Sequence, residues 1–194
     1  MQKRISYVIP VFNEGATLEA LYNALVPVLN TVEEKYLSEV IFVNDGSADT
    51  TYEKLLSLHE KDPRIIVINL SRNFGHQWAL TAGLDMTRGD ATIVLDGDLQ
   101  DPPAVSLDLI SKWEEGFEVV YAERRSRQDS TFKKYTAYVF YRLLDRLSDV
   151  SIPKDTGDFR LMDKKVVDTL REFREKNRFM RGLVSYVGFK QTGV

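Results

Sequence analysis

The sequence predicts an α/β fold in which a mainly parallel sheet carries helices on both of its faces. Apolar runs typical of strands alternate with helix-like segments four times before residue 121. The links between them are short, which favours right-handed crossovers and parallel strands. The chain has 194 residues, which suits one domain, and 43% of them are hydrophobic, which is enough for a core.

Apolar spacing locates each element in order along the chain. The predicted strands are 5–9, 40–43, 65–70, 91–95 and 117–121. Four predicted helices alternate with them, at 18–32, 49–58, 75–87 and 102–113. We expect Thr17 to cap the first helix and Asp49 the second, because short polar side chains accept hydrogen bonds from the first helical N–H groups. Pro102 and Pro103 are expected to open the fourth helix.

The later part of the chain follows a different pattern. Residues 131–150 form an aromatic-rich predicted helix whose apolar residues cover more than one stripe. Such a helix is either buried on two sides or also touches lipid or a second helix. A loop is predicted at 151–157, a sixth strand at 157–162 and a helix near 163–175.

Composition excludes several classes of protein. The chain has no cysteine, and its only histidines are His59 and His76. It therefore has no disulfide framework, no thiolate nucleophile and no zinc site built from several histidines. No apolar run approaches the length of a membrane span, and residues 1–10 are typical of a strand rather than a signal peptide, so the expected compartment is the cytosol.

Charge is distributed unevenly along the chain. Residues 1–122 carry a net charge of −10 and residues 123–194 carry +7, although the whole chain carries −3. The basic part is a candidate surface for an anionic partner, such as nucleic acid, anionic lipid or a phosphorylated substrate. Mixed-charge helices with solvated faces would give the same composition.

Polar residues follow four of the predicted strands. They are Asn13-Glu14, Asn44-Asp45, Ser71-Arg72-Asn73 and Asp96-Gly97-Asp98. Because ligands of parallel sheets bind at the carboxyl ends of the strands, these clusters locate the site at that edge. The chain has neither G-x-G-x-x-G after its first strand nor G-x-x-x-x-G-K-[ST], which disfavours a dinucleotide dehydrogenase and a P-loop nucleotidase.

The two aspartates beside Gly97 offer another way to bind a diphosphate. Asp96 and Asp98 follow a strand and can reach one hard cation from the same loop. Mg²⁺ or Mn²⁺ takes one or two carboxylates and fills its other positions with phosphate oxygens and water. Gln100 is close enough in sequence to orient a carboxylate or a metal-bound water. Asp-Gly is also a common turn, so this motif alone is not specific.

The other strand-end segments allow two interpretations each. Asp45 could accept from the imide of uracil or from a ribose hydroxyl, or it could form an Asx-turn or helix cap. Asn13 and Glu14 could bind the nucleoside or cap the first helix. Arg72 could pair with a phosphate or with an acid of the site, or form a surface salt bridge.

Taken together, these segments resemble the family 2 glycosyltransferases, which have the GT-A fold, a Rossmann-like mainly parallel sheet. The matching segments are VIPVFNE (8–14), VNDGSAD (43–49) and DGDLQDPP (96–103). Three further segments resemble the polyprenyl-phosphate branch, which includes dolichol-phosphate mannose synthases and bactoprenol glucosyl transferases. They are SRNFG (71–75), TGDFRL (156–161) and NRFMRGL (177–183). The resemblance covers essentially the whole chain.

The resemblance implies transfer of a sugar, with inversion, from a nucleotide sugar to the phosphate of a polyprenyl lipid. The expected donor is a UDP-sugar, and the expected cofactor is Mg²⁺ or Mn²⁺ held by Asp96 and Asp98. With the strand-end residues, it implies a nucleotide-binding set of Pro10, Val11, Asn13, Glu14, Asp45, Arg72, Gly97, Gln100, Arg124 and Lys134, with Lys133 as the alternative to Lys134. The basic residues Arg124 and Lys134 would bind either the diphosphate or the acceptor phosphate.

The nature of the acceptor decides the role of Asp158. A hydroxyl acceptor needs a general base, for which Asp158 would be the leading candidate. A phosphate monoester, with its second pKa near about 6, is mostly dianionic at neutral pH, so Asp158 would instead orient the donor sugar or Arg160. Arg160, Arg178 and Arg181 are candidates to bind the acceptor phosphate, because arginine suits bidentate phosphate recognition. The predicted catalytic set is Asp96, Asp98, Asp158 and Arg160.

Two departures from the family pattern matter. Asn44 stands where relatives often have Asp, and the chain stops at Val194, whereas bacterial relatives continue into amphipathic and transmembrane helices. We therefore expect 1–194 to be a single catalytic domain, basic and acceptor-facing from about 123 onward, without its C-terminal membrane anchor. The resemblance implies a homo-oligomer at the cytoplasmic face of the cell membrane.

Four other functions stay open at this point. A family 2 transferase acting on a saccharide or protein hydroxyl would keep Asp45 and the D-G-D segment but have no use for the arginines. A nucleotidyltransferase usually has a Gly-rich basic loop where this chain has PVFNEG. A non-catalytic nucleotide-sugar binder would tolerate Asp98→Asn. A nucleic-acid binder needs a basic groove, and the acidic strand edge argues against one.

Overall fold

The structure of the protein is a computed structural model, which describes residues 2–123, 156–173, 175 and 178–194. The predicted helix at 131–150 lies outside the described residues, and so do Arg124, Lys133 and Lys134. None of the helices in the described part of the chain combines the length and the apolar character that a bilayer span requires.

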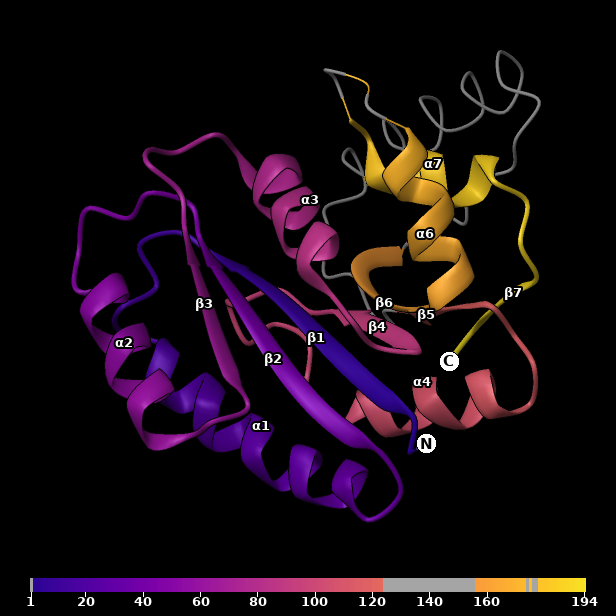
Figure 1. Ribbon diagram of the computed structural model, residues 1–194, viewed down its shortest axis with the longest axis horizontal. Helices are drawn as coiled ribbons and strands as arrows, with labels where there is room; N and C mark the ends of the chain where they lie inside the picture. The colour runs from indigo at the N-terminus through magenta and orange to yellow at the C-terminus, as the bar shows by residue number, and fades with distance from the viewer. Residues whose placement is uncertain (1, 124–155, 174, 176–177) are drawn as a thin grey trace, which may run out of the picture.

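The described residues form one seven-stranded sheet, which is parallel except for one strand (Figure 1). Its strands are β1 (Arg4–Val11), β2 (Leu37–Asn44), β3 (Ile65–Asn69), β4 (Ala91–Val94), β5 (Val119–Glu123), β6 (Thr156–Asp163) and β7 (Gln191–Gly193). Their order across the sheet is β3-β2-β1-β4-β6-β5-β7, and β6 runs antiparallel to both of its neighbours. The predicted mainly parallel α/β sheet is therefore confirmed.

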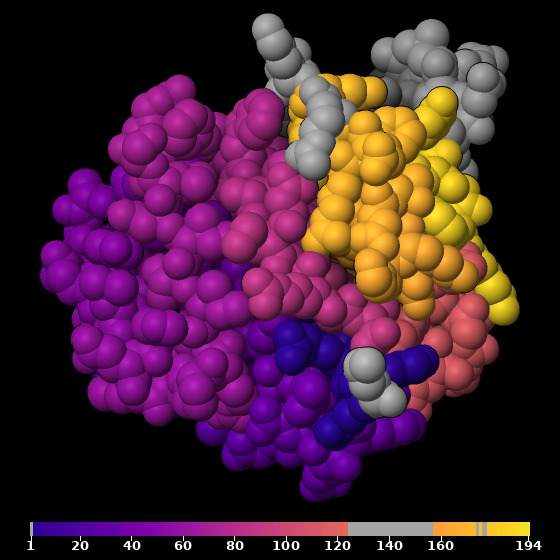
Figure 2. Space-filling view, viewed as in Figure 1, coloured from indigo at the N-terminus to yellow at the C-terminus, as the bar shows by residue number. Residues whose placement is uncertain are grey.

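Helices cover both faces of the sheet, as predicted. Helices α1 (Leu18–Glu33), α2 (Thr51–Lys61) and α4 (Val105–Glu114) pack on one face, and α3 (His76–Met86), α6 (Lys164–Glu172) and α7 (Met180–Tyr186) pack on the other. Side chains alternate along β1 and contribute to the hydrophobic core on each face of the sheet. Tyr7 belongs to the core under α1, α2 and α4, and the adjacent Val8 belongs to the core under α3, α6 and α7. In Figure 2 the α6–α7 region lies directly against α3.

The hydrogen bonds at the starts of the helices differ in part from those predicted. Thr17 stands at the N-cap of α1, but its side chain does not cap the helix; its hydroxyl donates instead to Glu14 Oε2 at 2.6 Å. Asp49 does accept from the backbone N–H of Thr51 at the start of α2, at 3.0 Å. The two prolines form a turn just before α4, in which Val105 N donates to Pro102 O.

The carboxyl ends of β1, β2, β3 and β4 meet at one edge of the sheet. Because β6 is antiparallel, its amino end lies at this same edge, so Asp158 enters the sheet where the other strands leave it. Short elements were not predicted, namely α7 with seven residues and β7 with three. Neither is long enough to show a periodic pattern.

Candidate functional site

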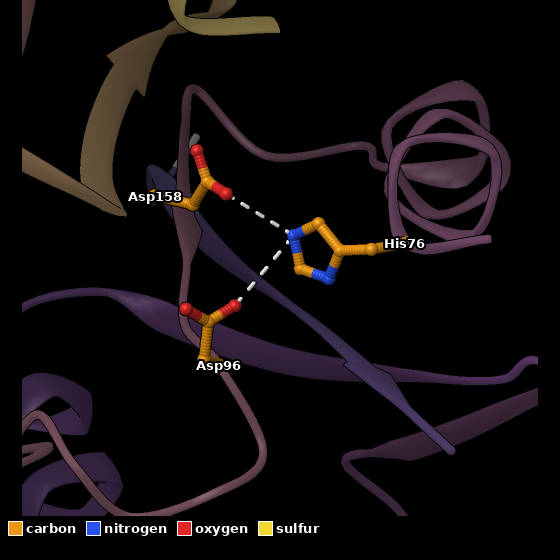
Figure 3. Close-up of side chains that lie close together, drawn as sticks. All are labelled: His76, Asp96 and Asp158. Carbon is orange, nitrogen blue, oxygen red and sulfur yellow. Dashed lines mark ion pairs between the residues drawn. The ribbon is translucent and has the colours of Figure 1, made fainter. Parts of the chain in front are cut away.

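Asp96 and Asp158 face each other at the carboxyl edge of the sheet. In the β4–β6 ladder Val94 pairs with Arg160, and carrying this register two residues further sets Asp96 opposite Asp158. His76, the first residue of α3, lies between them (Figure 3). Its Nε2 is 3.2 Å from Asp158 Oδ2 and 3.7 Å from Asp96 Oδ1. Three separate segments thus bring one imidazole and two carboxylates together.

Asp158 is held from its other side by arginine. Arg181 Nε, on α7, donates to Asp158 Oδ1 at 2.7 Å, and the guanidinium of Arg160 lies 3.9 Å from the same oxygen. Burial opposes ionisation of this carboxyl, but the hydrogen bonds from His76 and Arg181 outweigh it and hold the pKa of Asp158 well below its usual range. Asp158 is therefore a firmly ionised anion whose two oxygens both face donors.

The guanidinium of Arg160 lies inside the protein, with only 5% of the residue exposed. It donates to Gly157 O at 3.0 Å. Burial lowers the pKa of Arg160 to about 10, against the attraction of Asp158. It stays charged at neutral pH, which makes Asp158 its necessary counter-ion.

Asp96 has a different environment from Asp158. Its Oδ1 is buried and accepts no hydrogen bond. Burial raises the pKa of Asp96; His76 opposes this shift, and the neighbouring carboxylates of Asp158 and Asp98 add to it. A buried carboxylate oxygen without a donor is an incomplete arrangement, which a cation would complete.

The loop after β4 has a constrained backbone. Gly97 packs so closely against β1 that an added Cβ would lie 2.8 Å from Val11 Cγ1. Leu99 has a φ of 59°, in the left-handed region that residues with a Cβ rarely adopt. Asp98 is exposed, and its Oδ1 accepts from Gln100 N at 3.0 Å. The D-G-D segment is thus a turn with a constrained backbone, which presents the half-buried carboxylate of Asp96 and the exposed carboxylate of Asp98.

This donor set fits a hard divalent cation. Carboxylate oxygens suit Mg²⁺ and Mn²⁺, and Asp96 offers an oxygen without a hydrogen-bond donor. His76, Asp96 and Asp158 also lie close enough to form a candidate metal cluster, with ligand atoms within 4.8 Å of one another. Arg160 and Arg181 already neutralise Asp158, however, and their charges would repel a dication there. Asp158 is therefore the less suitable ligand of the two facing carboxylates.

Asp45 joins the end of β2 to the segment that leads into α3. Its Oδ1 accepts from Phe74 N at 2.8 Å and its Oδ2 from Gly75 N at 2.9 Å, and only 3% of the residue is exposed. Gly46 has a φ of 65°, and a Cβ there would lie 2.3 Å from the backbone carbon of Arg72. These are long-range hydrogen bonds rather than the local Asx-turn or the cap of the following helix that the sequence allowed, and through them Asp45 fixes the segment that leads into α3.

The segment after β1 is tied to the one after β2. Asn13, with a φ of 56°, accepts from Ala48 N through its Oδ1 and donates its own N–H to Ser47 Oγ, both at 2.9 Å. Glu14 accepts from the hydroxyl of Thr17. Pro10 and Val11 are buried at the end of β1. These predicted nucleoside residues therefore form one connected edge with Asp45.

Two of the predicted arginines make contacts outside the His76–Asp96–Asp158 cluster. Arg72 is exposed, stacks over the Phe74 ring at 4.0 Å and donates to Asn73 O. Arg178 donates to Thr81 Oγ1 at 2.9 Å and to the carbonyls of Leu170 and Phe173. Arg178 therefore joins α3 to the end of α6. These contacts do not link Arg178 to Asp158, whereas Arg160 and Arg181 both approach it.

His76 is the site residue that sequence reasoning missed. The number of histidines excluded a multi-histidine zinc site but gave His76 no other role, although His76 directly follows a strand-end segment at the start of a predicted helix. That position at the carboxyl edge was a usable signal. The partners of His76 were not predictable, because they are 20 and 82 residues away.

Comparisons with known proteins bear on this site. Residues 6–171 match the sequence profile of the family described as "Glycosyl transferase family 2". The chain is 53% identical over its whole length to an uncharacterized glycosyltransferase, YkcC, of Bacillus subtilis. It is 42% identical over 95% of its length to a bactoprenol glucosyl transferase of Shigella phage SfX. The chain spans 60% of the length of each of these relatives.

Solved structures give a matching fold. A mannosyltransferase from Pyrobaculum calidifontis, in complex with GDP-Man and Mn²⁺, superimposes with a TM-score of 0.71 at 17% identity, over all of this chain and 55% of that one. A Mycobacterium tuberculosis glucosyl-3-phosphoglycerate synthase, in complex with Mn²⁺, UDP and phosphoglyceric acid, gives 0.60 at 20% identity, over 84% of this chain and 57% of that one. The fold is that of the GT-A glycosyltransferases, as the sequence predicted.

Proposed function

Since this chain belongs to glycosyl transferase family 2, we propose that it transfers a sugar from a nucleotide sugar to the phosphate of a polyprenyl lipid. The choice between a phosphate and a hydroxyl acceptor rests on the contacts and the lowered pKa of Asp158. Similarity to bactoprenol glucosyl transferases, at 42% identity, supports the same class of acceptor. The lipid would bring the protein to the cytoplasmic face of the membrane.

Asp158 is poorly suited to remove a proton. Both of its oxygens face donors, at 3.2 Å from His76 and 2.7 Å from Arg181, and its pKa is lowered. A hydroxyl acceptor needs a base with a pKa nearer to neutral, because its proton must leave near the transition state. A phosphate acceptor is already an anion at neutral pH. The observed environment of Asp158 therefore favours phosphate over hydroxyl.

A phosphate acceptor needs cations instead of a base. Two phosphorylated reactants repel each other, and Arg160 and Arg181 supply positive charge beside Asp158. Arg178 was predicted to join them. Its contacts to Thr81 and to backbone carbonyls favour a supporting role, which we adopt here.

On the donor side, we propose that the edge formed by Pro10, Asn13, Glu14 and Asp45 receives the nucleoside, with uridine as the expected base. Asp96 and Asp98 would hold Mg²⁺ or Mn²⁺, with Gln100 fixing the Asp98 carboxylate through its backbone N–H. The ion, when bound, neutralises charge on the departing nucleoside diphosphate. The fixed turn around Gly97 holds its two carboxylates in place before the donor arrives.

Inversion follows from a single in-line displacement. The acceptor phosphate oxygen attacks the anomeric carbon, the bond to the nucleoside diphosphate breaks, and no proton has to move. The chain's part is then to orient two anions and shield their charges. A set of fixed ion pairs at one sheet edge is suited to that task.

An acceptor comparison tests this proposal. The chain is incubated with Mn²⁺ and a panel of UDP- and GDP-sugars, together with either detergent-solubilised undecaprenyl phosphate or soluble saccharides, and the glycosylated product is measured by mass spectrometry. We expect product only with the prenyl phosphate. Product with a saccharide alone would transfer the chain to the hydroxyl-acceptor class, and binding of nucleotide without any product would make it a binding module.

A further inference from the structure

We propose that His76 is a positioning residue, which holds Asp158 against its two arginines and spaces the β4 loop from β6. This inference rests on the proposed function for its consequence in catalysis, but its geometry is independent of it. His76 contacts Asp158 and Asp96 through one nitrogen, Nε2. No pattern in the sequence assigned it a role.

The backbone of His76 is fixed by its neighbours. Phe74 N and Gly75 N both donate to the carboxylate of Asp45, which ties the segment before α3 to the end of β2. Gln77 Oε1 accepts from Met180 N at 2.9 Å, which ties the start of α3 to the start of α7. His76 thus starts its helix between two anchors. Its imidazole ring is half-exposed, so it is not there to fill the core.

The ring connects the two segments that continue beyond the end of the β4–β6 ladder. The β4–β6 pairing ends at Val94 and Arg160, two residues before Asp96 and Asp158 come opposite each other. Two carboxylates facing each other repel. His76 Nε2 lies between them and forms an ion pair with each, at 3.2 Å from Asp158 Oδ2 and 3.7 Å from Asp96 Oδ1, which accepts no hydrogen bond (Figure 3).

The contact with His76 determines which way Asp158 faces. With Nε2 on Oδ2, the remaining oxygen Oδ1 is directed to Arg181 Nε at 2.7 Å and toward Arg160 at 3.9 Å. The chain His76–Asp158–Arg181 therefore runs from α3 through β6 to α7. Without the imidazole, Asp158 Oδ2 loses this partner, and the carboxylate that faces the two guanidinium groups is held less firmly.

This role needs the hydrogen-bond donor of the imidazole. It does not need the basicity of the ring or its affinity for metals. Glutamine at position 76 places an N–H₂ group at a similar reach and keeps the hydrogen bond to Asp158. Alanine removes it. His59 provides the matched control, because it lies on α2 and its Nδ1 contacts Ile65 O instead.

The direct test observes Arg181 in solution. The Nε–H resonance of Arg181 is followed by ¹⁵N–¹H NMR in the wild type, His76→Ala, His76→Gln and His59→Gln, and is assigned by its loss in Arg181→Lys. We expect His76→Ala to shift this resonance and to speed its exchange with water by about tenfold, as expected for loss of one charge-assisted bond in the chain. His76→Gln and His59→Gln should leave it unchanged.

A binding experiment supplies the functional arm. Calorimetry with UDP and Mn²⁺, and then with farnesyl phosphate as a short prenyl phosphate, should show an affinity for the prenyl phosphate about tenfold weaker in His76→Ala, with UDP affinity within about twofold and near-complete recovery in His76→Gln.

Three outcomes would overturn the role of His76. They are an unchanged Arg181 resonance in His76→Ala, equal effects of alanine and glutamine, and loss of Mn²⁺-dependent UDP binding in both variants, which would make His76 a metal ligand. If the wild type does not bind farnesyl phosphate, the proposed acceptor is wrong, while the NMR arm still decides the role of His76.

Discussion

Replacing Asp45 by asparagine separates its two possible roles. The carboxylate accepts from Phe74 N at 2.8 Å and from Gly75 N at 2.9 Å, and it is almost fully buried. Asparagine keeps one acceptor but turns an N–H₂ group toward the other N–H. A buried hydrogen bond to a charged group contributes about 1.5–3 kcal/mol, so Asp45→Asn should lower the free energy of unfolding by about 2 kcal/mol.

Urea unfolding followed by circular dichroism measures this loss. The matched control is Asp108→Asn, an exposed acid on α4, which should stay within about 0.5 kcal/mol of the wild type. UDP binding in the presence of Mn²⁺ is measured on the same samples. If Asp45→Asn unfolds like the wild type and yet fails to bind UDP, the carboxylate serves the base rather than the segment before α3, and the reasoning from its contacts is refuted.

Three further predictions follow from the site and its supports. Asp98→Ala should abolish UDP binding in Mn²⁺, as EDTA should for the wild type; equal affinity with and without EDTA would remove the metal from the site. Arg178→Ala should lower the free energy of unfolding by about 3 kcal/mol, with UDP affinity near normal, because its guanidinium joins α3 to α6, and a large loss of UDP affinity would contradict this. The hydrogen bond from Arg64 lowers the pKa of Asp62, so this carboxylate stabilises the fold above about pH 4 and loses its effect as the pH falls through its folded pKa. Asp62→Asn should therefore flatten the loss of stability that is measured between about pH 5 and 2. An unchanged slope would argue against this role of Asp62.

The framework of the fold was predictable because its signals are local. The helix at 18–32 showed regular apolar spacing, and the structure places α1 at Leu18–Glu33. Strand β1 extends past its predicted end, since Val11 O accepts from Asp45 N and so continues the pairing beyond Pro10. Polar residues after four strands located the site at the carboxyl edge, and Asp96 and Asp158 do meet there.

What could not be predicted depends on contacts between distant segments. The antiparallel insertion of β6 between β4 and β5 is set by pairing across the sheet, and a run such as Phe159–Met162 gives no direction. The contacts of Arg178 with Thr81 and the Leu170 carbonyl were not predictable, because arginine has the same local signature on a phosphate as on a helix-end carbonyl. The bridging place of His76 depends on that same antiparallel strand.

The antiparallel strand also has a consequence for how this sheet can vary. The chain leaves β5 at Glu123 and re-enters the sheet at Thr156, and these two residues pair with each other beyond a register shift in the β5–β6 ladder, at the edge that carries the carboxylates. A stretch whose two ends are neighbours can be exchanged or lengthened at small entropic cost, since loop closure grows only slowly with length. Glu123 and Thr156 are therefore suitable end points for exchanging the residues between them among relatives, because both ends stay anchored in the sheet.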